Sequence, residues 1–332
     1  MTGATIFGCA GARLSPEEKS FFRDAAPFGF ILFARNLETP DQIAALTAEL
    51  RDCVGRNAPI LIDQEGGRVA RLRPPAWLDW PAALDQMQKT APEHAARAMW
   101  LRYRLIADEL MAIGIDTNCA PLADVPAKGV HEIIRNRCYG EDVASVTEAA
   151  RAVADGLLAG GVLPVLKHIP GHGRPVADSH LELPEVDAEA TCLRAVDFAA
   201  FAALADLPMG MTAHVVYHAF DARPATQSPV MMDLIRREIG FDGLLMTDDL
   251  SMQALSGDMA TRTRASLTAG CDVVLHCNGT MAEMAEVADH ADGLTGKAAD
   301  RAAQALAARR VPDEIDRVAL LAEYHRLTML PS

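Results

Sequence analysis

The sequence predicts a single (β/α)8 barrel, and three observations support this fold class. Eight short apolar, β-rich runs recur over the first 280 residues, and stretches with helical periodicity separate them. Polar residues gather where these runs end, as expected at the carboxyl-terminal face of a parallel barrel. A doubly wound open sheet is the main alternative, but its first strand normally leads into a glycine-rich fingerprint that Gly8-Cys9-Ala10-Gly11 matches poorly.

The expected elements follow one another in a regular order. The strands are 5–7, 29–33, 59–62, 113–118, 163–166, 208–212, 243–247 and 272–275. The helices between them include 41–53, 92–112, 143–159, 188–204 and 261–269. Thr39-Pro40 and Ser228-Pro229 mark helix starts, because proline is favoured at the first helical position. Closing helices at 281–291, 297–309 and 312–327 complete one domain over residues 1–332.

The composition excludes several functional classes. Hydrophobic residues make up 50% of the 332 residues and charged residues 23%, which is typical of a soluble globular protein. The formal net charge of −14 argues against nucleic acid and anionic membrane surfaces as partners. No apolar run reaches the roughly 18 residues of a membrane span. The N-terminus has no signal-peptide pattern, and seven scattered cysteines without CxxC spacing predict reduced thiols in a cytoplasmic protein.

The stretch that follows the fifth expected strand carries the strongest signal. It reads Lys167-His168-Ile169-Pro170-Gly171-His172-Gly173 and continues to Asp178-Ser179-His180. Loops that follow strands are where rigid scaffolds place their chemistry, and a loop this rich in titratable groups is typical of a functional site. The seventh expected strand leads into a second polar segment, Thr247-Asp248-Asp249-Leu250-Ser251-Met252.

These motifs resemble glycoside hydrolase family 3, and specifically its short β-N-acetylhexosaminidase branch. The family pattern K-H-[FI]-P-G-H-G followed by D-S-H matches the segment 167–180, and G-[FL]-D-G-x-x-x-[ST]-D-D-L-S-M resembles the segment around Asp248. The resemblance covers roughly residues 1–280. Departures are small: Ile169 stands where Phe is commoner, and Cys138 replaces the Ser or Ala that usually follows Arg137.

The resemblance implies three catalytic residues. Asp248 matches the nucleophile, whose carboxylate forms a glycosyl ester that water later cleaves. His180 matches the acid/base, a role that suits imidazole because its unperturbed pKa lies near neutrality. Asp178 would orient the His180 ring, as the aspartate of a Ser-His-Asp arrangement does. Asp249, in contrast, is expected to cap the helix that follows it.

Further residues match family positions that grip the sugar. They are Asp63, Arg71, Arg137, Lys167 and His168. Charged donors and acceptors of this kind bind hydroxyls and amides through charge-assisted hydrogen bonds. His214 resembles a family position beside the nucleophile, and His172 is expected to shape its loop. Glu65-Gly66-Gly67 is expected to form a turn with positive φ at glycine.

The resemblance therefore implies a monomeric, cytoplasmic exo-β-N-acetylglucosaminidase that acts with retention, without a metal ion or cofactor. Its substrates would be small carbohydrates, namely N-acetylglucosaminyl peptidoglycan fragments met in cell-wall recycling. A family 3 phosphorylase is an alternative, because a histidine acid/base does not repel an incoming phosphate. A metal-dependent barrel hydrolase and a non-catalytic sugar-binding protein are further alternatives, which chelation and any turnover of an aryl glycoside would test.

Overall fold

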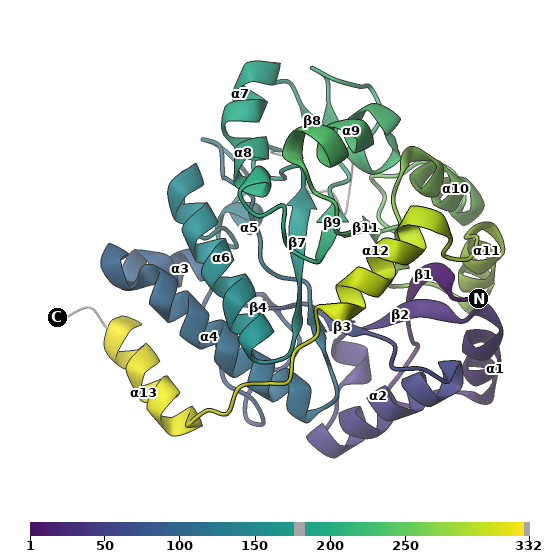
Figure 1. Cartoon of the computed structure of the whole chain (residues 1–332), viewed down its shortest axis with the longest axis horizontal. Helices are drawn as coiled ribbons and strands as arrows, with labels where there is room; N and C mark the ends of the chain where they lie inside the picture. The colour runs from purple at the N-terminus through teal and green to yellow at the C-terminus, as the bar shows by residue number, and fades with distance from the viewer. Residues whose placement is uncertain (176–182, 329–332) are drawn as a thin grey trace.

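The computed structural model describes residues 1–175 and 183–328 as a closed parallel barrel surrounded by helices (Figure 1). Its eight strands are β1 (Gly3–Gly8), β2 (Pro27–Leu32), β3 (Ile60–Ile62), β6 (Thr117–Asn118), β7 (Leu163–Ile169), β9 (Met209–Thr212), β11 (Leu244–Asp249) and β12 (Val273–His276). Neighbouring strands pair in chain order, and β1 closes the ring by pairing with both β2 and β12. The predicted (β/α)8 fold is confirmed.

The barrel strands lie close to their expected positions, and burial explains why. The residues of β2, β3, β7 and β12 are all buried, which is typical of strands covered by helices on one side and by the barrel interior on the other. The fourth strand is shorter than the expected 113–118. Gly114 adopts a positive φ of 78°, and the Asp116 carboxylate accepts the Ile60 N–H at 2.8 Å, so regular pairing begins only at Thr117.

The helices surround the barrel. They are α1 (Pro16–Ala25), α2 (Pro40–Val54), α3 (Ala83–Lys89), α4 (Pro92–Ala112), α5 (Glu132–Arg135), α6 (Val143–Ala159), α7 (Ala190–Ala195), α8 (Asp197–Ala202), α9 (Pro229–Leu234), α10 (Met259–Ala269), α11 (Met281–His290), α12 (Gly296–Ala307) and α13 (Arg317–Thr328). The starts of α2 and α9 agree with the sequence: Thr39 accepts the Gln42 N–H at 3.2 Å, and Ser228 accepts the Met231 N–H at 3.1 Å.

One expected helix is divided in two. The segment 188–204 forms α7 and α8, which meet at Val196, whose φ of −118° and ψ of −72° lie well away from the ideal helical values of about −63° and −42°. The break places the buried Asp197 at the start of α8, where its Oδ2 accepts from Nε of Arg174 at 2.7 Å. A side-chain contact of this kind is not visible in the helical periodicity of the sequence.

Helix α12 closes the amino-terminal end of the barrel. Ala302 and Ala305 of α12 are buried in the same apolar cluster as Ile6 and Phe28, which come from β1 and β2. Helix α13 packs along α4 (Figure 1), where Arg97 pairs with Glu323 at 2.9 Å. The carboxyl-terminal ends of the strands are left for the loops that carry the polar motifs. Among residues 1–175 and 183–328, no helix is both long and apolar enough to cross a membrane.

Candidate active site

A cavity of about 340 Å³ opens at the carboxyl-terminal ends of the barrel strands. Seven of the eight barrel strands contribute side chains to its lining, either from the end of the strand or from the loop that follows it. Its polar lining consists of Asp63, Arg68, Arg71, Arg137, Lys167, His168, His172, Asp248, Asp249 and Asn278. The nucleophile candidate Asp248 and all five residues expected to grip the sugar therefore share one cavity.

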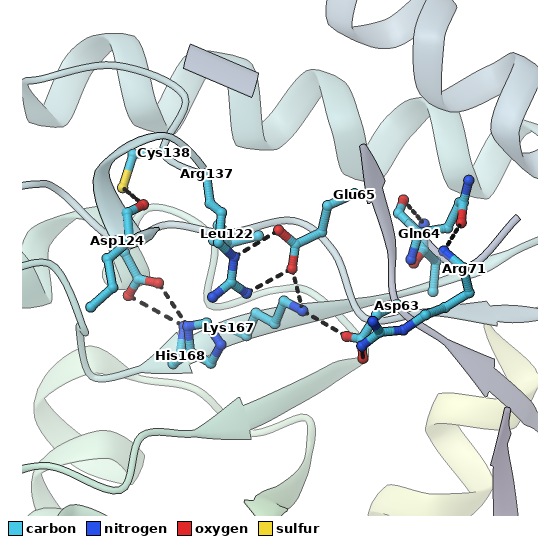
Figure 2. Close-up of polar contacts among 12 residues, drawn as sticks. Asp63, Gln64, Glu65, Arg71, Leu122, Asp124, Arg137, Cys138, Lys167 and His168 are labelled. Carbon is cyan, nitrogen blue, oxygen red and sulfur yellow. Dashed lines mark hydrogen bonds and ion pairs between the residues drawn. The ribbon is translucent and has the colours of Figure 1, made fainter. Parts of the chain in front are cut away.

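Five charged side chains form a continuous chain of ion pairs along one wall (Figure 2). Lys167 on β7 lies at its centre, with Nζ 3.0 Å from Asp63 Oδ1 and 2.7 Å from Glu65 Oε1. Arg71 pairs with the other oxygen of Asp63 at 3.1 Å. Arg137 binds both oxygens of Glu65, at 2.9 and 2.7 Å. Because each charge is fixed by its neighbours, the wall presents preset donors and acceptors to a polar ligand.

Burial and charge act in opposite directions on the pKa values of these groups. Burial raises the pKa of Glu65, but Arg137 and Lys167 outweigh it and lower the pKa to about 2. Burial opposes ionisation of Asp63 in the same way, and Lys167 and Arg71 nevertheless hold its pKa well below the usual range. Burial lowers the pKa of Lys167, while the two carboxylates overcome this and raise it. All three groups are therefore ionised at neutral pH.

His168 is oriented by a buried carboxylate that stands on the loop after β6. Its Nδ1 lies 2.8 Å from Asp124 Oδ2, and since a carboxylate only accepts, this nitrogen carries the proton. The other oxygen of Asp124 accepts the backbone N–H of His172 at 2.6 Å. Figure 2 shows the Asp124–His168 pair beside the ion-pair chain. The arrangement leaves Nε2 as the ring nitrogen of His168 that Asp124 does not engage.

His172 stands next to His168 in the same loop. The two rings meet at 69° with centroids 5.5 Å apart. Burial, together with the charge of His168, lowers the pKa of His172 to about 4, so its ring is neutral near pH 7. Its backbone bond to Asp124 agrees with the expected loop-shaping role, and a Cβ added at the following Gly173 would clash with the backbone of Val125.

Asp248 lies at the end of β11 with one carboxylate oxygen held by the backbone. Its Oδ1 accepts the N–H of Asp249 at 2.8 Å. Burial raises its pKa, yet the nearby His214 and His168 outweigh that effect and lower it, so the group is an anion. A half-buried carboxylate anion at the wall of a polar cavity has the properties of a nucleophile or of an electrostatic stabiliser.

The expectation that Asp249 caps the next helix is wrong. Helix α10 begins at Met259, and Asp258 is its N-cap. The Asp249 carboxylate instead joins two strand ends: Oδ1 accepts the N–H of Cys277 at 3.0 Å, and Oδ2 accepts from Asn278 Nδ2 at 3.3 Å. A turn separates β11 from the helix, so a rule based on helix capping misplaces this residue.

His214 is buried beside the Asp248–Asp249 pair. Its Nε2 donates to the carbonyl oxygen of Asp249 at 3.1 Å, which leaves Nδ1 to accept from the Thr226 hydroxyl at 2.7 Å. Burial lowers its pKa, and the ring is neutral. The structure thus places His214 next to the carboxylate pair, as the resemblance implied. His214 is not among the described residues that line the cavity.

Arg71 owes its position to a short hairpin, β4 (Gln64–Gly66) and β5 (Val69–Ala70). The buried Gln64 side chain accepts the N–H groups of Arg71 and Leu72 at 2.8 and 3.0 Å. Gly66 and Gly67 have φ of 118° and 55°, which confirms the expected turn. A side chain at Gly66 would also clash with Arg102, so glycine is required there for two reasons.

Two functional residues, Glu65 and Asp124, are absent from the sequence-based prediction of the site. Glu65 is predicted only as part of a turn, although it stands two residues after Asp63, and alternate residues of an extended segment point to the same side. That spacing could have found it. Asp124 follows the fourth strand at the expected face, but nothing in its local sequence indicates the contact with His168. The proposed acid/base His180 and its partner Asp178 lie outside the described residues.

The described part of the chain contains no cluster suited to a metal ion. Within residues 1–175 and 183–328, no three His, Cys, Asp or Glu side chains are grouped so that they could hold one. His168 has its Nδ1 engaged by Asp124, and His214 has both ring nitrogens engaged within the protein.

Comparison with known proteins decides the family. The model of the glycosyl hydrolase family 3 N-terminal domain matches residues 9–318. The chain belongs to glycosyl hydrolase family 3. A beta-hexosaminidase from Methylococcus capsulatus is 40% identical over 96% of this chain and 94% of its own length. One from Bordetella avium is 35% identical over 94% and 90%.

Solved structures agree with this assignment. The structure of native NagZ from Neisseria gonorrhoeae matches with a TM-score of 0.84 and 32% identity, covering 98% of this chain and 96% of that one. A second structure of that protein is a complex with N-trifluoroacetyl-D-glucosamine, with the same TM-score and coverage. This family 3 chain is therefore a glycoside hydrolase similar to the beta-hexosaminidases, and the cavity described above lies where barrel enzymes carry their active sites.

Proposed function

We propose that the protein is an exo-acting β-N-acetylglucosaminidase that works by double displacement with retention. The observation that carries the proposal is the position of Asp248: an ionised carboxylate stands at the cavity wall, and the ion-paired residues Asp63, Lys167 and Arg71 line the same cavity. A nucleophile and a preset polar wall in one cavity are what a glycosyl-transfer site requires.

In the first step, Asp248 attacks the anomeric carbon while the acid/base protonates the departing oxygen. We assign the acid/base role to His180 and its orientation to Asp178, on the strength of the Asp178-Ser179-His180 motif. In the second step, the same group takes a proton from water, and the water cleaves the glycosyl ester on Asp248. Asp248 is suited to both steps, because a depressed pKa keeps it an anion and makes it a stable leaving group.

We propose that the ion-pair chain positions the sugar so that its anomeric carbon faces Asp248. Asp63 accepts hydrogen bonds from hydroxyl groups, while Arg71, Arg137, Lys167 and His168 supply complementary groups. The pairing has an energetic reason. Each charge is already stabilised in the empty site, so binding a neutral sugar requires little reorganisation.

We also propose a physiological substrate, process and location. N-acetylglucosaminyl peptidoglycan fragments are the proposed substrates and cell-wall recycling the proposed process, with residues 1–332 acting as one monomeric catalytic domain in the cytoplasm. The similar NagZ from Neisseria gonorrhoeae forms a complex with N-trifluoroacetyl-D-glucosamine, an N-acylated glucosamine, which supports the sugar class. The seven cysteines are all free thiols, five of them buried, which fits a reducing compartment.

A product assay tests the proposal and its nearest alternative together. The enzyme is incubated with 4-nitrophenyl N-acetyl-β-glucosaminide, with and without inorganic phosphate. Release of N-acetylglucosamine at a rate independent of phosphate is expected. Acceleration by phosphate with formation of the sugar 1-phosphate would instead establish a phosphorylase, and no turnover under either condition would leave a sugar-binding protein.

A further inference from the structure

Arg35 ties together three strand ends at the seam where the barrel closes. It stands in the short 3-10 helix Ala34–Asn36 after β2. Its Nε donates to the carbonyl of Cys9, after β1, at 2.9 Å, and Nη2 donates to the carbonyl of Cys277, after β12, at 2.6 Å. Nη1 donates to Oδ1 of Asn278 at 2.5 Å. All three acceptors are neutral and belong to residues that follow β1 or β12, the two strands that meet at the seam.

Asn278 connects Arg35 with the carboxylate pair Asp248 and Asp249. Its Nδ2 lies 3.3 Å from Asp249 Oδ2. A guanidinium only donates and a carboxylate only accepts, so the amide can satisfy both neighbours in one orientation only. An aspartate at this position could not, because it would set a second anion against Asp249. Asparagine is therefore the residue type that connects a cation on one side with an anion on the other.

The contact reaches Asp248 through the backbone. Asp249 is held by Asn278, by the N–H of Cys277 and by Ser251, whose N–H and hydroxyl lie 3.0 and 2.6 Å from its carboxylate oxygens. The N–H of Asp249 in turn holds Oδ1 of Asp248 at 2.8 Å. A shift of Asp249 would thus move the donor that aims the Asp248 carboxylate.

We propose that Arg35 is a positioning residue for the first glycosyl-transfer step, acting through Asn278 and Asp249 on the orientation of Asp248. This inference rests on the proposed function, since it needs Asp248 to be the nucleophile. Arg35 itself is not among the described residues that line the cavity, whereas Asn278 is. Its effect is therefore on the geometry of the attacking oxygen and not on contact with the sugar.

A second route from Arg35 to the cavity has to be separated from this one. The Arg35 guanidinium also lies 5.0 Å from the ring centroid of Phe33, and Arg71 lies 5.3 Å from the same ring. Phe33 lines the cavity. Loss of Arg35 would then shift Phe33, disturb Arg71 and weaken sugar binding. This effect would not depend on Asn278.

The experiment is a double-mutant cycle on a substrate that needs no acid. Arg35→Gln, Asn278→Ala and the double variant are assayed with 2,4-dinitrophenyl N-acetyl-β-glucosaminide. Each single variant should lose kcat/KM by about 10- to 100-fold, the scale of a misaligned reacting group. The double variant should be at most about threefold worse than Asn278→Ala, because the two residues act in series. The inhibition constant of N-acetylglucosamine should change less than about threefold, since the binding wall is intact.

Arg97→Gln is the matched control. Arg97 is also an exposed arginine over an aromatic ring, 4.6 Å from the centroid of Trp100, and it also makes side-chain hydrogen bonds, to Glu323. It lies on the outer helix α4, so wild-type kinetics are expected. Arg35→Lys, which keeps the charge and can make one of the bonds, should recover part of the loss seen in Arg35→Gln.

The outcomes separate the two claims. A wild-type enzyme that does not turn over the glycoside would defeat the proposed function. An active wild type with unimpaired Arg35→Gln, with multiplicative losses in the double variant, or with weakened N-acetylglucosamine binding would defeat the positioning role alone. If Arg35→Gln does not fold, Arg35→Lys and Asn278→Ala still decide, because both must lower kcat/KM without weakening N-acetylglucosamine binding.

Discussion

At the scale of single residues, the site depends on charges that the protein has already paired. Lys167 contacts two carboxylates, and Arg137 grips one of them with two hydrogen bonds. Removing Glu65 would take from Arg137 the carboxylate that holds it, and a buried charge that loses its partner is costly. The same residues therefore affect stability and activity together, and experiments must measure both.

Asp248 and its neighbour Asp249 should respond differently to the same chemical change. Asp248→Asn should fold normally and lose nearly all activity, because an amide cannot form the glycosyl ester. Asp249→Asn should lose less activity, since one oxygen remains to accept from Cys277 and only the contacts of the other are lost. Steady-state kinetics with the 4-nitrophenyl glycoside provide the measurement. A reversed order of the two losses would show that the pair is wrongly assigned.

Glu65 gives a prediction for stability against pH. Its pKa is about 2 in the folded protein and its ordinary value is 4.5, so pairing stabilises the fold above the ordinary value and this contribution disappears as the pH falls towards 2. The shift corresponds to about 3 kcal/mol. The advantage of wild type over Glu65→Gln in unfolding free energy should therefore narrow between about pH 7 and pH 3.5.

Urea unfolding at several pH values within this window measures the difference. Glu93→Gln is the control, because Glu93 is exposed on the first turn of α4, and its difference from wild type should stay small throughout. A gap between wild type and Glu65→Gln that does not change with pH would mean that Glu65 is not held as a strongly stabilised anion.

At the scale of elements, the loop after β7 is confined by its glycines. A Cβ at Gly173 would clash with the Val125 carbonyl, so Gly173→Ala must displace the loop that carries His172. We expect a loss of kcat/KM of about 10-fold or more, because the displaced loop carries His172, which lines the cavity. Gly11→Ala is the control, since a Cβ there meets nothing within 4 Å. Equal kinetics for the two variants would contradict this account of the loop.

Elements differ in how well the sequence predicts them. The barrel strands and most helix boundaries follow from apolar runs and capping residues, as at Thr39 and Ser228. The division between α7 and α8 does not, because it depends on a contact between Arg174 and Asp197, twenty-three positions apart. The role of Asp249 could not be predicted for a similar reason. Its partner Cys277 follows the next strand, whereas helix-capping rules consider only the residues next to it in the sequence.

At the scale of the whole molecule, the ring of strands turns separate motifs into one site. The segments around Asp63, Lys167 and Asp248 are far apart in the sequence, and the position of each after a strand is sufficient to predict that they meet. The contacts among these segments cannot be predicted from the sequence. Ion pairing of Lys167 with Glu65 and of Asp124 with His168 depends on side-chain directions that only the assembled barrel defines.

Metal independence is a prediction for the whole enzyme, and it has its own test. The proposed mechanism moves protons and a glycosyl group with side chains alone, so activity should survive prolonged dialysis against EDTA. The measurement is kcat/KM before and after dialysis, with zinc added back to a portion of the sample. Loss of activity on chelation with recovery on zinc would place the protein among the metal-dependent hydrolases.

The central claim is that Asp248 carries the sugar while His180 manages the proton, and one measurement tests both. His180→Ala is mixed with 2,4-dinitrophenyl N-acetyl-β-glucosaminide, whose phenolate leaves without an acid, and the protein is examined by mass spectrometry and peptide mapping. The account predicts a rapid burst of dinitrophenolate and an N-acetylglucosaminyl adduct on Asp248 that hydrolyses slowly, because the base is missing. The same variant should barely cleave a disaccharide. No adduct, an adduct on another residue, or equal losses on both substrates would contradict the account.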